Sequence, residues 1–84
     1  MDEFTVKLSV PAEHMRNVFG EYDTFIKKIE KELSVTIVNR DEEIKITGTE
    51  KSANRARSVL ENLVTLSKRG NAIQEQNVNY TIEM

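Results

Sequence analysis

The sequence predicts a small α+β domain whose elements follow the order β-α-α-β-β-α. Three patterns support this prediction: apolar and polar residues alternate near the start, two amphipathic segments meet at Gly20, and a long apolar stripe follows Thr49. A chain of 84 residues buries only roughly 60 to 65% of the surface that its unfolded form exposes. We therefore expect one domain with a single core.

The first strand and the first helix are expected before Gly20. Residues 4–10 alternate apolar and polar side chains, which is typical of a strand with one buried face. Pro11 supplies a φ suited to the first turn of a helix. The following apolar residues recur at helical spacing, at Met15, Val18 and Phe19. Gly20 is placed to end this helix in a left-handed conformation.

A second helix is expected directly after the glycine, so that a very tight turn joins the two helices. A side-chain oxygen of Asp23 or Thr24 can cap its first turn. The apolar face of this helix comprises Phe25, Ile26, Ile29 and Leu33. The charged residues between them, Glu30 among them, are expected to face solvent.

A hairpin and a long helix complete the predicted domain. The β-branched runs at residues 35–38 and 43–47 indicate strands, and the polar residues 39–42 between them form a turn. Thr49 is a good N-cap for a helix that runs to Arg69. Its buried stripe is expected at Ala53, Ala56, Leu60, Leu63 and Ser67, flanked by Val59, Val64 and Leu66.

Residues 71–84 are expected to extend beyond a domain formed by residues 1–70. The apolar spacing of residues 78–82 is that of a strand. The same segment also fits a helix, whose inner face would carry Ile73, Asn77, Val78 and Thr81. We favour a short helix and keep the strand as the alternative.

The composition and charge exclude several classes of function. The chain is 38% hydrophobic and 31% charged, contains no cysteine, and carries a net charge of −2. The absence of cysteine excludes disulfides and thiolate metal sites, and the negative charge argues against strong autonomous RNA binding. No apolar run approaches the roughly 18 residues of a membrane span, and the start is acidic where a secretory signal would be basic. A cytoplasmic domain without membrane contact is expected.

No catalytic or metal site is predicted. His14 is the sole histidine and is expected at the surface of the first helix. No Ser/His/Asp set, carboxylate pair or metal-ligand spacing accompanies it. We expect the isolated chain to be a non-enzyme that holds no cofactor.

The stretch from Val18 to Ile37 resembles the KH nucleic-acid-binding motif. That motif joins an apolar pair, a G-x-x-G loop, a helix with Ile-x-x-Ile spacing and a buried strand. The matching segments here are Val18-Phe19, Gly20-Glu21-Tyr22-Asp23, Ile26 with Ile29, and residues 35–38. Asp23 replaces the second loop glycine. The resemblance implies the type I KH fold, a three-stranded sheet with three helices on one face.

The run from Val18 to Ile82 is also similar to the amino-terminal domain of PhoH-like ATPases. The matching features include Ile44-x-Ile46-x-Gly48, Ser67-Lys68-Arg69-Gly70 and Val78-x-Tyr80. This resemblance implies that the chain is a fragment and that residues 71–84 lead toward a P-loop ATPase domain in cis. That domain, whose G-x-x-x-x-G-K-[ST] motif the 84 residues lack, would bind ATP and a divalent metal.

The KH resemblance nominates a site for single-stranded RNA around the loop, the second helix and the hairpin turn. Its residues are Arg16, Gly20, Glu21, Tyr22, Asp23, Lys27, Lys28, Lys31 and Arg40. The resemblance also places Val18, Ile26 and Ile37 in an apolar groove for the bases. Each of these residues has a structural explanation as well: a helix cap, a solvated helix face, or the core.

Two functions follow from these expectations. The first is an accessory domain that binds single-stranded RNA beside a PhoH-type ATPase. The alternative is a KH fold that has lost RNA binding and serves protein–protein interaction or homo-oligomer assembly. The acidic side chains of Glu21 and Asp23 motivate the alternative, because they would repel a phosphate.

Overall fold

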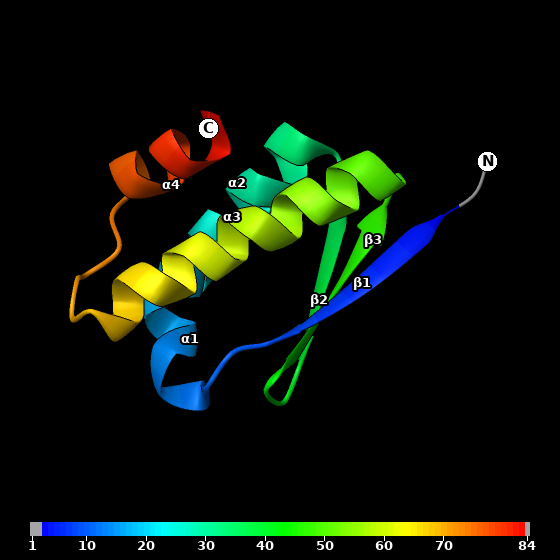
Figure 1. The fold of residues 1–84 in the computed structure, drawn as a ribbon. Coiled ribbons are helices and arrows are strands. Elements are labelled where there is room, and N and C mark those ends of the chain that lie inside the picture. Colours follow the sequence, from blue (N-terminus) through cyan, green and yellow to red (C-terminus); the bar gives the residue numbers. More distant parts are fainter. Residues whose placement is uncertain (1–2, 84) are drawn as a thin grey trace.

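A computed structural model describes residues 3–83 and contains the predicted elements followed by one further helix (Figure 1). A 3-10 turn at Glu21–Asp23 separates the first two helices. The elements are β1 (Phe4–Ser9), α1 (Ala12–Phe19), α2 (Thr24–Leu33), β2 (Thr36–Arg40), β3 (Glu43–Gly48), α3 (Glu50–Lys68) and α4 (Glu75–Glu83). The predicted order is therefore confirmed.

The three strands form one antiparallel sheet in the order β1-β3-β2. In this register Val6, Ile46 and Ile37 lie side by side across the sheet. Strand residues alternate between two faces, so this row points to one side of the sheet and the neighbouring polar rows point to the other. Figure 1 shows α1, α2 and α3 on a single face of the sheet. The type I arrangement is thus confirmed, and the other face is open to solvent.

Helix α3 packs against β1 and β3 through its predicted stripe. Ala53 and Ala56 are fully buried where the helix lies on the sheet, because their small side chains permit a close approach. The Oγ1 of Thr49 accepts a hydrogen bond from the Ser52 amide at 3.1 Å, as expected of an N-cap. Leu60 and Leu63 are fully buried and extend the core toward α1.

Helix α4 folds back against α2 and α3, so the favoured prediction of a short helix in the extension is confirmed. Val78 is fully buried and Ile82 nearly so, and both belong to the common core. Arg55 on α3 donates a hydrogen bond from Nη2 to the Ile82 carbonyl at 2.6 Å. The described part of the extension therefore packs on the domain. Met84, together with Met1 and Asp2, lies outside the described residues.

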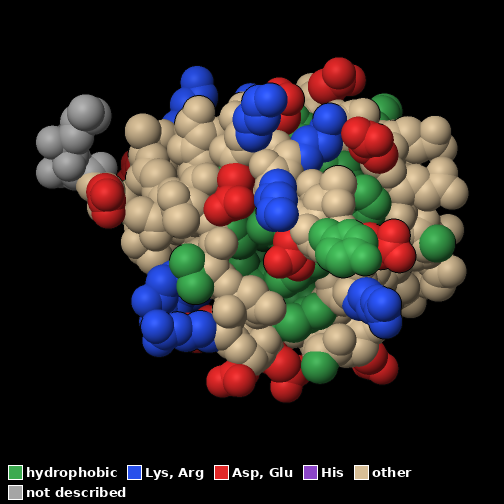
Figure 2. Space-filling view, turned by 180° about the vertical axis from the view of Figure 1, so that it is seen from behind, with side chains coloured by type: hydrophobic (Ala, Val, Ile, Leu, Met, Phe, Trp, Pro, Cys, Tyr) green, Lys and Arg blue, Asp and Glu red, His purple; other side chains and the backbone are tan. Residues whose placement is uncertain are grey.

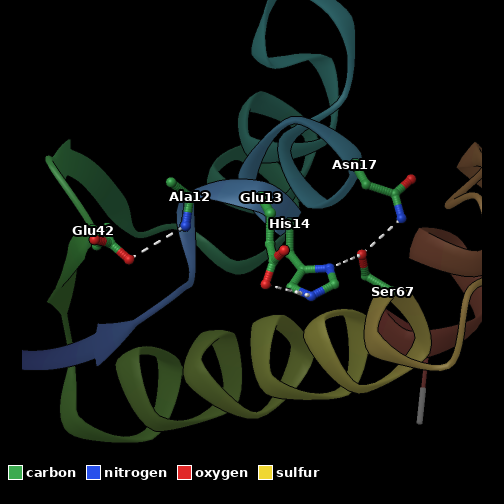
Figure 3. A network of polar contacts seen from close by, with 6 residues as sticks. All are labelled: Ala12, Glu13, His14, Asn17, Glu42 and Ser67. Carbon is green, nitrogen blue, oxygen red and sulfur yellow. Dashed lines mark hydrogen bonds and ion pairs between the residues drawn. The ribbon is translucent and has the colours of Figure 1, made fainter.

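A polar network joins α1 to the end of α3, and His14 belongs to it rather than to the free surface (Figure 3). His14 is only partly exposed, and its Nδ1 lies 2.8 Å from the Ser67 hydroxyl. Asn17 donates from Nδ2 to the same hydroxyl at 2.8 Å, and its Oδ1 accepts from the Ile73 amide. The expectation of a surface histidine is therefore wrong, because these partners satisfy the ring within the fold.

Candidate nucleic-acid interface

The loop between α1 and α2 has a left-handed backbone at three of its four positions. Gly20 has φ 81 and ψ 168, a conformation open essentially to glycine alone. A Cβ atom on Gly20 would also lie 2.8 Å from the Cδ2 of Phe25. Tyr22 and Asp23 have φ values of 55 and 58. Asp23 therefore occupies the conformation that glycine commonly supplies, and aspartate tolerates it better than most residues do.

The predicted side-chain cap of α2 is absent in the structure. Asp23 stands at the N-cap position but makes no side-chain capping hydrogen bond. An N-cap residue usually has an extended backbone, whereas the backbone of Asp23 is left-handed. The hydroxyl of Thr24 instead donates to the Glu21 carbonyl within the loop. The expectation of capping by either residue was therefore wrong.

The loop surrounds a shallow hollow of about 370 Å³, which Arg16 borders from α1. Gly20, Glu21, Tyr22 and Asp23 all line this hollow. The Tyr22 side chain is 89% exposed, so it has no place in the core. Five of the nine predicted site residues thus lie around one opening.

The three lysines of α2 do not share one face. Lys27 and Lys31 are exposed one helical turn apart. Lys28 is partly buried and points to α4, where its Nζ lies 3.7 Å from Glu75 Oε1. Lys27 and Lys31 are therefore the cations of α2 that a ligand beside the loop can reach.

The predicted apolar residues and Arg40 do not line the hollow at the loop. Val18 and Ile26 are core residues, whereas Ile37 is partly exposed at the edge strand β2. Arg40 is exposed and lines a separate hollow of about 170 Å³ with Val38, Glu43 and Lys45. Among the three apolar residues nominated for base contacts, only Ile37 is accessible.

Residues 5–62 match the family model described as the KH domain. The chain belongs to the KH domain family. The structure of this chain is similar to those of the first and thirteenth type I KH domains of human vigilin. The TM-scores are 0.71 and 0.73, at 20% and 22% sequence identity. These matches cover 88% and 86% of this chain and 83% and 82% of those structures. They support the fold alone.

Two further proteins that match this KH domain are longer than it. A protein of unknown function from Aeropyrum pernix matches with a TM-score of 0.78 at 17% identity, over 99% of this chain and 47% of that structure. A PhoH-like protein of Bacillus subtilis (strain 168) is 37% identical over 78 residues, which is 93% of this chain. The chain spans 24% of the length of that curated relative. The resemblance to PhoH-like proteins is confirmed by this match.

Glu30 is a feature of the KH domain that sequence reasoning missed. It was expected to face solvent, yet it is partly buried, and its Oε2 accepts a hydrogen bond from the Ile37 amide at 2.8 Å. Its own carbonyl accepts from the Val35 amide at 3.2 Å. Glu30 thus bridges α2 and β2. Helical periodicity alone gives no signal for this role, because it cannot indicate where β2 passes.

Charges of both signs cover the face that contains the site. Figure 2 views the KH domain from the side away from α3, where hydrophobic side chains form a central band surrounded by cations and carboxylates. Neither sign predominates on this face, so binding there would depend on local contacts. Within residues 3–83, no cluster of three metal-binding side chains occurs. No helix in that range has the length and apolarity needed to cross a membrane.

Proposed function

We propose that this KH domain binds single-stranded nucleic acid, RNA in particular, along the loop at residues 20–23 and the exposed side of α2. The observation that carries the proposal is the exposed loop with its left-handed backbone, bordered by Arg16. The amides of Gly20, Asp23 and Thr24 already donate to carbonyls of the chain, so a phosphate at this loop would accept from other amides at the start of α2. Lys27 and Lys31 continue the cationic path along α2.

The proposed affinity is modest because carboxylates stand among the cations. Glu21 and Asp23 are exposed on the loop and oppose a phosphate, whereas Arg16 attracts it. Tyr22 offers an exposed ring on which a base can stack, and such stacking contributes about 1 to 3 kcal/mol per base. Stacking and the amides at the start of α2 would therefore supply much of the binding energy, with a small electrostatic share.

Within a longer protein, the domain would act as an accessory module. Its curated relative is a PhoH-like protein about four times as long as the matched region. We propose that residues 1–70 present RNA to an ATPase domain that follows the extension at residues 71–84. In that arrangement ATP and a divalent metal belong to the ATPase domain.

Protein–protein interaction is the second candidate function, and an exposed surface at α4 favours it. Tyr80 is 69% exposed and lines a hollow of about 260 Å³ with Leu66 and Arg69. An aromatic ring beside an arginine is a common composition of protein interfaces. This candidate predicts assembly through α4 and leaves the loop unoccupied.

A titration with short single-stranded RNA at two salt concentrations tests the proposal. Fluorescence anisotropy of a labelled oligonucleotide should reveal binding at low salt that weakens as salt is raised. A Tyr22→Ala variant should bind more weakly, whereas Tyr80→Ala should bind as the natural chain does. Salt-independent signals, or equal losses in the two tyrosine variants, would argue for the second candidate.

A further inference from the structure

A groove runs between α3 and α4, which lie beside each other (Figure 1). Two adjoining hollows of about 360 and 260 Å³ form it, and Asn62 and Thr81 line both of them. Arg55 lines the first hollow, and Arg69 lines the second together with Tyr80. No residue of the loop between α1 and α2 lines either hollow. This α3–α4 groove is therefore separate from the proposed RNA site.

The α3 wall of the groove is a row of exposed side chains. They recur at intervals of three and four positions, which places them along one side of a helix, and they are Arg55, Ser58, Asn62, Thr65 and Arg69. An arginine stands at each end of the row, and the 14 positions between them correspond to about 21 Å of helix. Alternating intervals of three and four are also the spacing with which two nearly parallel helices pack. The groove therefore suits a partner that is itself a helix.

Apolar surface lies near one end of the groove. Tyr80 on α4 is 69% exposed, and Leu66 on α3 is partly buried beside it in the second hollow. Tyrosine and arginine are enriched in protein interfaces. A strand of phosphates would gain nothing from Leu66, whereas an apolar side chain of a protein can pack on it. This composition favours a protein segment over nucleic acid.

The charge of α3 favours an acidic partner. Residues 50–69 contain five of the 12 cations of the chain and only two of its 14 carboxylates, so they carry a charge of +3 while the rest of the chain carries −5. One of the two carboxylates, Glu61, lies 3.7 Å from Arg57 and is offset by it. The net positive charge therefore comes from the remaining cations of the helix.

The arginines at the ends of the row retain donors for a ligand. Within residues 3–83, neither Arg55 nor Arg69 lies in an ion pair. Arg55 uses one N–H group of its five for the Ile82 carbonyl, which also fixes its place beside α4. A guanidinium with free N–H groups binds a carboxylate through two parallel hydrogen bonds.

We propose that the α3–α4 groove docks an acidic amphipathic helix of a partner protein. Two carboxylates of that helix, about 14 positions apart, pair with Arg55 and Arg69, and an apolar side chain between them packs on Leu66 and Tyr80. This is the helix-in-groove mode of recognition. The inference rests on the second candidate function, for which it names the partner, and it does not depend on RNA binding at the loop.

The test titrates a synthetic helical peptide into the ¹⁵N-labelled chain. The peptide has about 18 residues of alanine and glutamine, a length at which isolated helices form, with two glutamates 14 positions apart and a leucine midway. A matched peptide carries lysine in place of both glutamates. Arg69→Gln and Tyr80→Ala each remove one contact of the groove. Arg57→Gln is the control, because Arg57 is an exposed arginine of α3 that lines neither hollow.

The glutamate peptide should shift amides of residues 55–69 and 78–82, and the lysine peptide should not bind. Arg69→Gln should weaken binding about threefold, as the loss of an exposed ion pair implies, and Tyr80→Ala should weaken it at least as much. Arg57→Gln should retain the affinity. Absence of shifts in these ranges, binding of both peptides, or equal losses in the two arginine variants would overturn the inference.

A parallel titration with single-stranded RNA separates this inference from the proposed function. RNA that shifts residues 20–31 in a chain that binds no peptide would overturn the docking groove alone. A chain that binds the peptide but shows no RNA shifts at residues 20–31 would retain the groove and lose the RNA site. RNA that shifts residues 55–69 and 80 in place of the peptide would make the groove a nucleic-acid surface and overturn the inference.

Discussion

Gly20 and Asp23 stand at the two ends of the loop between α1 and α2, yet only Gly20 requires glycine. The Gly20 backbone has an extended ψ at positive φ, and a Cβ added to it would lie 2.8 Å from the Phe25 ring. Asp23 has an ordinary left-handed conformation, which aspartate can adopt at modest cost. The KH loop thus keeps its shape here with one glycine. Asp23, in place of the second glycine, adds a negative charge to the loop.

Gly20→Ala should destabilise the domain by about 3 kcal/mol, because backbone strain adds to the clash with Phe25. Gly70→Ala is the matched control: Gly70 also has positive φ, 90, but nothing lies within 4 Å of its added Cβ. We expect the control to cost about 1 kcal/mol. Urea denaturation of both variants measures the difference. Equal losses would contradict the proposed packing of Phe25 on the loop.

Asp23→Asn should raise the affinity for single-stranded RNA about two- to fivefold. Asparagine tolerates the left-handed backbone equally well, so the variant removes only a carboxylate near the phosphate path, an effect of about 0.5 to 1 kcal/mol for an exposed charge. Asp41→Asn offers a control, since Asp41 is left-handed too, with φ 54, but lies in the hairpin turn. If both variants raise the affinity equally, net charge rather than the loop determines it.

The sequence predicted which residues form the loop, but not their backbone conformations. Asp23 was expected to be a cap because aspartate is common at N-caps, and its left-handed φ reversed that expectation. His14 and Asn17 lie 53 and 50 positions before Ser67, and no local pattern signals that they meet it. Glu30 is comparable, since its role depends on the path of β2.

At the scale of elements, the strands and the long helix were predictable because their patterns are unambiguous. Residues 4–10 keep a strict period of two, and the apolar stripe of α3 continues for several turns. The extension was less certain because its apolar residues satisfy both periods. In the structure this segment is a helix that packs against α2 and α3. That same packing turns Lys28 toward Glu75, which the sequence of α2 alone does not indicate.

Val78→Ala should destabilise the whole domain by about 2 kcal/mol, because the side chain is fully buried beneath α4 and its loss leaves a cavity. Tyr80→Ala, two residues away on an exposed position, should change the free energy of unfolding by less than about 0.5 kcal/mol. Thermal or urea unfolding followed by far-ultraviolet circular dichroism measures both. An unchanged midpoint in Val78→Ala would mean that residues 71–84 are an appendage that unfolds separately.

For the whole molecule, the distribution of charge matters more than the net charge of −2. Lys27 is exposed beside the proposed path, whereas its neighbour Lys28 is paired with Glu75 of α4. Lys27→Ala should lower RNA affinity about two- to fivefold, and Lys28→Ala should leave it nearly unchanged. Anisotropy titrations at low salt measure both variants. Comparable losses would show that RNA reaches the α4 side of α2.

The central claim is that single-stranded RNA binds along the loop and α2. Titrating unlabelled RNA into the ¹⁵N-labelled domain, with amide shifts recorded at several salt concentrations, tests it most directly. We expect shifts confined mainly to residues 16–31 and 37–40. The logarithm of the affinity should fall with the logarithm of salt with a slope of about −1.5 to −2, as two or three phosphate contacts to a single strand imply. Saturating RNA that shifts no amide of residues 20–31, or that shifts only α4 around Tyr80, would contradict the claim.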